Sequence, residues 1–194
     1  MTVSSTSTPV GSHPTVAWSR RVRRVGGLIQ VAFAAFWLGR ASLTVGGGAG
    51  AALAGASLLV LAAVCAYGVR TAAAPRPIGP EARRIERAVT LATILQLVAS
   101  FVAPVIAGAV GQGEWALPSV AITIGPLLLW LGRRVDIPRY RGVGWALIIG
   151  PVALVSAISG AALAITVGFA AGVLLLATAT AGFHDLARSD PRPG

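Results

Sequence analysis

The sequence predicts an all-α fold, a polytopic membrane bundle of six transmembrane helices arranged as three hairpins with both termini in the cytoplasm. Two observations carry this prediction. First, hydrophobic residues make up 55% of the 194 residues and charged residues only 11%, whereas a soluble domain usually carries about 25% charged residues. Second, fifteen of the sixteen arginines fall on one side of an alternating apolar pattern.

The apolar stretches have the length of membrane spans. A helix needs about 20 apolar residues to cross a hydrocarbon core of about 30 Å. The predicted spans cover residues 25–45, 50–69, 88–110, 115–132, 143–158 and 161–183. Residues 143–183 contain no charge, and one helix of that length would be about 60 Å long, so we expect a turn at Ser159-Gly160.

These spans form one domain with two tails. We expect a single transmembrane domain over 20–188. The Ser-, Thr- and Pro-rich residues 1–19 predict a disordered cytoplasmic tail, and residues 189–194 a short cytoplasmic C-terminal tail. Pro80-Glu81 is typical of a helix start, so the third helix is expected to begin near Glu81, before its span.

The arginines orient the bundle. Those on one side are Arg20, Arg21, Arg23, Arg24, Arg70, Arg76, Arg83, Arg84, Arg87, Arg133, Arg134, Arg139, Arg141, Arg188 and Arg192. The opposite loops hold only Arg40 and Glu114. Because short cytoplasmic loops are rich in Lys and Arg, we expect a plasma-membrane protein whose arginine side contacts anionic lipids. The net charge of +10 is then explained without a nucleic-acid partner. The use of arginine without lysine, beside abundant Ala and Gly, indicates a bacterial source.

Small residues and prolines predict how the helices pack and bend. Small residues recur at every fourth position in the third and sixth spans, which favours close helix contact in lipid. The predicted packing positions are Ala103, Ala107, Gly168 and Gly172. Proline removes a helix hydrogen bond and bends the helix. The predicted kinks are at Pro104, Pro126 and Pro151.

Polar residues near the spans supply two candidate pairs. Arg40 and Glu114 are expected at similar depth on the outer side, as a structural or gating pair. Gln30 and Gln96 lie in the cytoplasmic halves of spans one and three and can form an intramembrane hydrogen bond of about 1 kcal/mol. Tryptophans cluster toward span ends and predict an interfacial aromatic belt. They are Trp37, Trp115, Trp130 and Trp145.

Three classes of function remain open. No catalytic, cofactor-binding or metal-binding motif is recognisable in the sequence, so we expect no cofactor and no enzyme activity. The first hypothesis is action through helix packing or contact with a membrane protein partner or a second copy. The alternative is a small transporter or channel built on kinked helices three to five. A membrane-embedded enzyme is third, and would need His184, Asp185 and Asp136 together at a cytoplasmic cleft.

One stretch resembles a known group. Residues 125–133, Gly-Pro-Leu-Leu-Leu-Trp-Leu-Gly-Arg, precede Asp136-Ile-Pro-Arg-Tyr140 and Gly142. They resemble a group of uncharacterised small bacterial six-helix membrane proteins, in which Gly-x-His-Phe-x-Pro-Leu-x-Arg precedes an x-Pro-x-Tyr loop. Here Leu127, Leu128 and Trp130 replace the His, Phe and Pro. The size and layout are also similar to acid-resistance membrane proteins of the HdeD type. The resemblance covers about twenty residues and implies no activity.

Overall fold

The part of the chain that the structure describes folds into six α-helices. The computed structural model describes residues 14–70 and 80–188. The elements are α1 (Pro14–Val45), α2 (Gly47–Arg70), α3 (Pro80–Ala109), the 3-10 turn η1 (Gly113–Trp115), α4 (Ala116–Arg134), α5 (Pro138–Val155) and α6 (Gly160–Arg188). Every element of these described residues is helical, as the sequence predicts.

Five segments are long and apolar enough to cross a membrane. They are Arg24–Val45, Gly47–Arg70, Glu86–Ala109, Gly113–Arg134 and Gly160–Arg188. The chain therefore has the helices of a multi-pass membrane protein. The remaining helix, α5, has 18 residues and carries Arg139 and Arg141 in its first turn, which lowers its hydropathy.

Two helix starts differ from the predicted boundaries. α1 begins at Pro14, inside the segment predicted to be a disordered tail; residues 1–13 of that tail, and 189–194 of the other, lie outside the described residues. α5 begins at Pro138, before the predicted span 143–158, and ends at Val155. Proline is favoured at the first position of a helix because its fixed φ suits the helix and no N–H is lost. The chain then turns into α6 at Gly160, whose φ of +63° suits glycine.

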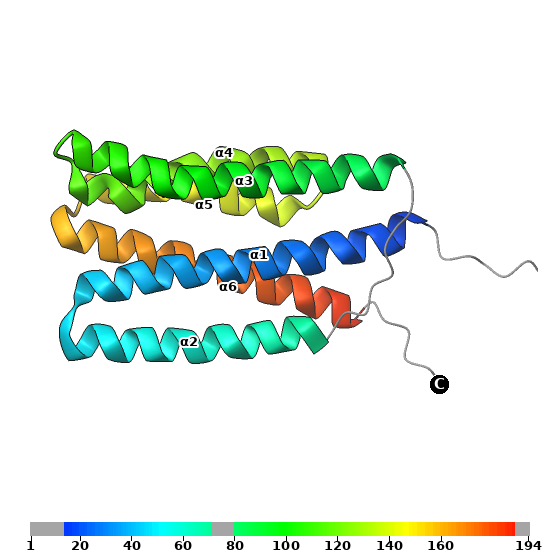
Figure 1. The fold of residues 1–194 in the computed structure, drawn as a ribbon, viewed down its shortest axis with the longest axis horizontal. Coiled ribbons are helices and arrows are strands. Elements are labelled where there is room, and N and C mark those ends of the chain that lie inside the picture. Colours follow the sequence, from blue (N-terminus) through cyan, green and yellow to red (C-terminus); the bar gives the residue numbers. More distant parts are fainter. Residues whose placement is uncertain (1–13, 71–79, 189–194) are drawn as a thin grey trace, which may run out of the picture.

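The helices lie side by side around a central pair (Figure 1). α1 and α6, from opposite ends of the chain, make the most extensive contact; α2 flanks them on one side, and α4, α5 and α3 lie on the other. The consecutive helices α1 and α2 pack together, as do α3 and α4. α5 packs mainly on α4 and contacts α6 less, so α5 and α6 are joined by a short turn without forming a closely packed pair.

Glycines allow the central helices to approach. A Cβ placed at Gly168 would lie 2.8 Å from the Cβ of Ala41, and one at Gly172 would lie 2.6 Å from Cγ of Leu38. The predicted positions Gly168 and Gly172 of α6 thus lie on its contact face with α1, where a larger residue would separate the helices. Of the predicted α3 positions, Ala107 is buried and Ala103 is half-buried against the core.

The predicted proline positions lie inside continuous helices. Pro104, Pro126 and Pro151 fall within α3, α4 and α5, and helix extends on both sides of each. Pro151 is buried and Pro126 is exposed, so the three prolines do not share one surface.

One part of the predicted aromatic belt is wrong. Trp37 is fully buried in the core and packs edge-on against Phe36, with ring centroids 5.9 Å apart. It lies on the face of α1 that contacts α6, where the Trp37 carbonyl oxygen lies 3.4 Å from a Cβ placed at Gly168. By contrast, Trp130 and Trp145 are exposed, as expected of interfacial residues.

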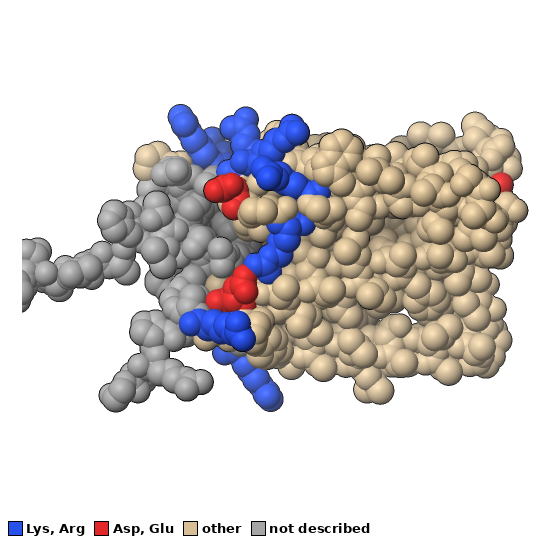
Figure 2. Space-filling view, turned by 180° about the vertical axis from the view of Figure 1, so that it is seen from behind, with Lys and Arg blue, Asp and Glu red and all other residues tan. Residues whose placement is uncertain are grey.

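Charge is concentrated at one end of the bundle (Figure 2). This end is formed by the last turns of α2, α4 and α6, which carry Arg70, Arg133, Arg134 and Arg188, and by the first parts of α3 and α5. We call it the arginine end. Arg40 and Glu114 lie toward the opposite, outer end.

Candidate functional site

The interior polar groups are amides and hydroxyls. The buried polar side chains among the described residues are Gln30, Ser42, Gln96, Ser100 and Thr178. Some of these groups are satisfied within their own helix: the Ser100 hydroxyl donates to the Gln96 carbonyl at 2.8 Å, and that of Thr178 to the Leu174 carbonyl at 2.7 Å. Such bonds to the preceding turn are common for Ser and Thr in helices.

Within the described part of the chain, three buried polar atoms have no hydrogen-bond partner, and all belong to α1. They are Nε2 of Gln30, Nε1 of Trp37 and Oγ of Ser42. A buried polar atom left unpaired costs about 1–3 kcal/mol, so each calls for a physical explanation. Gln30 and Trp37 are seven residues apart and therefore share one helix face.

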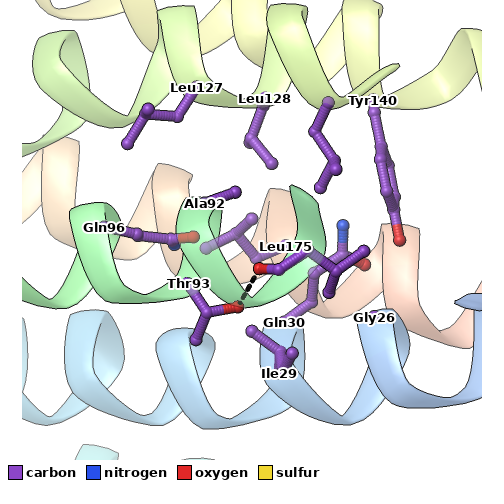
Figure 3. A pocket seen from close by; sticks show the side chains of 12 residues that line it. Gly26, Ile29, Gln30, Ala92, Thr93, Gln96, Leu127, Leu128, Tyr140 and Leu175 are labelled. Carbon is purple, nitrogen blue, oxygen red and sulfur yellow. Dashed lines mark hydrogen bonds between the residues drawn. The ribbon is translucent and has the colours of Figure 1, made fainter. Parts of the chain in front are cut away.

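Gln30 lines a small cavity in the half of the bundle nearest the arginine end (Figure 3). This Gln30 cavity has a volume of about 30 Å³. Its polar lining comes from Gln30 of α1, from Thr93 and Gln96 of α3 and from Tyr140 of α5, while α4 and α6 supply leucines. The Thr93 hydroxyl donates to the Val89 carbonyl at 2.8 Å. Five helices thus contribute to one partly open space.

A second cavity, of about 10 Å³, lies next to the first and shares only Gln30 and Tyr140 with it. Its lining includes Thr178 and Arg139. Arg139 forms an ion pair with Asp185 of α6, so α5 and α6 are joined here at the arginine end. The two cavities therefore follow one another from the arginine end into the bundle, with Gln30 and Tyr140 between them.

The predicted Gln30–Gln96 pair shares this cavity without bonding. Both amides are buried and line it. No hydrogen bond joins them among the described residues, since Nε2 of Gln30 has no acceptor. The reason is geometric, because α1 and α3 make few direct contacts and the cavity lies between them.

The predicted Arg40–Glu114 pair shares a larger pocket at the outer end. This outer pocket has a volume of about 280 Å³, and Arg40, Glu114 and Gly160 are among its lining. Glu114 accepts a hydrogen bond from the backbone N–H of Gly160 at 2.5 Å. Within the described chain no ion pair connects Glu114 to Arg40. The first N–H groups of a helix have no internal partner and carry partial positive charge, so the start of α6 receives the carboxylate instead.

Titratable groups at the arginine end do not form a cluster. Asp185 pairs with Arg139, not with His184. Over residues 14–70 and 80–188, no three His, Cys, Asp or Glu side chains are close enough to hold a metal ion.

Sequence reasoning missed Tyr140, Thr93 and Thr178 as lining residues. A helical-face signal exists for one of them, because Thr93 lies three residues before Gln96 and shares its face. Tyr140 and Thr178 lie on α5 and α6, far from Gln30 in the sequence, and only the packed bundle brings them beside it.

The comparisons with known proteins found no relatives. No protein-family model, curated protein or solved structure matches the chain. Function is therefore argued from the helices and cavities themselves.

Proposed function

We propose that this protein is a multi-pass protein of the cell membrane, with both termini in the cytoplasm, that acts without catalysis through helix contact with a second membrane protein or a second copy of itself. The arginine end faces the cytoplasm because positively charged loops are retained there. The observation that carries the proposed contact is the distribution of glycines on α2.

The glycines of α2 fall into two groups. A Cβ at Gly50 would lie 2.5 Å from the Ser42 carbonyl oxygen, and one at Gly68 would lie 2.5 Å from the Phe183 ring, so contacts within the bundle account for both. A Cβ at Gly48 or Gly55 would meet no atom within 4 Å. Glycine in the middle of a helix costs about 0.5–1 kcal/mol relative to alanine, and nothing within the described chain offsets that cost at Gly55, while Gly48 lies in the first turn of α2.

These two glycines lie on the outward face of α2. The buried residues Gly50, Leu61 and Gly68 mark the inward face. At 100° per residue, Gly48 and Gly55 fall on the opposite side. There they lie among residues that are also small, so a second helix could approach the α2 backbone closely, which is the usual form of helix association in lipid.

Site-directed photo-crosslinking tests the proposal. In a Cys65→Ser background, a single cysteine replaces Ala52, which is exposed on α2 between the two glycines, and is labelled with a photoreactive maleimide in native membranes. The matched control is Leu97→Cys on α3, whose native side chain is 53% exposed. We expect a protein adduct of defined mass from Ala52→Cys alone, and its loss when Gly55→Leu is added. Equal adducts from both positions, or none from Ala52→Cys, would refute the proposed contact.

A carrier or channel is the second candidate, and one observation favours it. Trp37, which is fully buried and whose Nε1 has no partner, lies along α1 between Gln30 of the Gln30 cavity and Arg40 of the outer pocket. The pathway would follow α1 through the Gln30 cavity, whose lining also comes from helices three to five, α3, α4 and α5. In proteoliposomes, Trp37→Ala should then raise the permeability to glycerol, measured by stopped-flow light scattering, while Trp37→Phe should not. Unchanged permeability in folded Trp37→Ala protein would exclude this candidate.

A further inference from the structure

We propose that an anionic glycerophospholipid of the arginine-side leaflet binds between α1 and α3, with an ester carbonyl in the Gln30 cavity that accepts a hydrogen bond from Nε2 of Gln30. This inference requires the helices to lie in a membrane, but it does not depend on the proposed helix contact of α2.

Gln30 supplies the recognition element. Its side chain is 6% exposed, and its Nε2 has no acceptor in the protein. An amide N–H can only donate, so the missing partner must bring an acceptor oxygen. The lining of the Gln30 cavity includes no charged residue, which favours a neutral oxygen over a carboxylate or a phosphate.

The walls of the cavity suit a lipid. Apolar side chains surround the amide, with Ile29 from α1, Val89 from α3 and Leu127 from α4. α1 and α3 make few contacts with each other, and the cavity between them is partly open. A volume of about 30 Å³ admits a group the size of one or two water molecules. A carbonyl group fits this space, and the acyl chain that bears it would lie outside, along the two helices.

The depth of Gln30 agrees with the position of lipid esters. Gln30 is six residues beyond Arg24, about 9 Å along the axis of α1. The interfacial zone of a bilayer is about 5–8 Å thick on each side. With Arg24 at the outer edge of this zone, Gln30 lies just inside the hydrocarbon boundary, within reach of the glycerol esters. Arginines of the flanking helices, Arg24 of α1 and Arg87 of α3 among them, lie nearer the end of the bundle, at the level of the headgroup, and favour an anionic lipid.

Three lipids separate the parts of this recognition. The purified full-length chain in detergent is titrated with diester phosphatidylglycerol, its diether analogue and diester phosphatidylcholine, and bound lipid is counted by native mass spectrometry. The diether lipid keeps the headgroup and lacks the carbonyls. One hydrogen bond in a membrane protein is worth about 0.6–1.7 kcal/mol, so the diester should bind about 3- to 15-fold more tightly than the diether. Phosphatidylglycerol should also bind more tightly than phosphatidylcholine.

The variants assign each preference to its residues. Gln30→Leu should abolish the preference for diester over diether and keep the preference for phosphatidylglycerol. The double variant Arg24→Gln/Arg87→Gln should do the reverse. Ser42→Ala, which changes a buried polar residue of α1 outside this cavity, should change neither. Equal binding of diester and diether lipid to the native chain overturns the proposal, as does an unchanged diester preference in Gln30→Leu. If these lipid preferences are absent while Ala52→Cys of α2 still forms its protein adduct, the lipid proposal fails and the proposed helix contact stands.

Discussion

The ring of Phe183 is held between two glycine backbones, which makes a sharp prediction about packing. A Cβ at Gly68 of α2 would lie 2.5 Å from the ring, and one at Gly27 of α1 would lie 2.6 Å from it on another side. An ordinary contact needs at least 3.4 Å, so Gly68→Ala requires a displacement of about 0.9 Å. The ring cannot move freely, because Phe183 is fully buried and the α1 backbone bounds it.

We therefore expect Gly68→Ala to destabilise the protein. Overpacking costs about 1–3 kcal/mol, and the better helix propensity of alanine offsets about 1 kcal/mol of this, which leaves a net loss of up to about 2 kcal/mol. The assay is unfolding in mixed detergent–SDS micelles followed by circular dichroism. Gly39→Ala on α1 is the control, since its Cβ would meet nothing within 4 Å, and it should be neutral or slightly stabilising.

A double variant tests the cause. Phe183→Leu alone should lose stability because it loses packing. In the double variant with Gly68→Ala, the smaller side chain should leave space for the added methyl group. The double variant should therefore lose less stability than the sum of the two single losses, by about 1 kcal/mol or more. If Gly68→Ala is as stable as Gly39→Ala, or if the two losses add in full, the ring is not confined as described.

Four further outcomes concern other residues. Glu114→Gln removes a charge from the start of α6 and should lower stability by about 0.3–1 kcal/mol; an unchanged unfolding midpoint would contradict this. Asp185→Asn breaks the ion pair with Arg139. Because the side chains of Asp185 and Arg139 are 41% and 33% exposed, the loss of stability should be about 0.2–1 kcal/mol and should vanish at 1 M salt. Trp37→Phe deletes an unpartnered buried N–H and should be nearly neutral, whereas a loss above about 2 kcal/mol would reveal a missing partner. Gly48→Cys in a Cys65→Ser background should react with an impermeant maleimide on intact cells, and reaction only after permeabilisation would invert the proposed topology.

The helices follow from the sequence because their determinants are local. Apolar length sets the spans, and α1 ends at Val45 where the glycines of the next turn begin. Both glycines of this turn, Gly46 and Gly47, have positive φ. This is the conformation that glycine adopts more readily than other residues. The pairing of α1 with α6 has no such local signal. It depends on matching surfaces of two helices that lie more than one hundred residues apart. The pattern of small residues in α6 predicts only one of these two surfaces.

The candidate site was predictable in its residue types and not in its bonds. Gln30 and Gln96 are conspicuous because amides are rare in these spans, and both do line one cavity. Their predicted hydrogen bond does not form, because α1 packs mainly on α6 and makes few contacts with α3. In the same way Glu114 and Arg40 share a pocket, but sequence alone does not show that the first N–H of α6 competes for the carboxylate.

The three unpaired atoms of α1 are not equivalent. Ser42 has an alternative within its own helix, since a serine hydroxyl can rotate toward the carbonyl four residues back, as Thr44 does with the carbonyl of Arg40. The indole N–H of Trp37 is rigid and sits in the most closely packed part of the core, where it accompanies a ring that is retained for its volume. Gln30 differs from both, because a leucine of similar size would fill its position without an unpaired donor and with a gain of apolar packing. The amide at Gln30 thus costs stability that an apolar residue would not, and recognition of an external acceptor is the physical role that accounts for it.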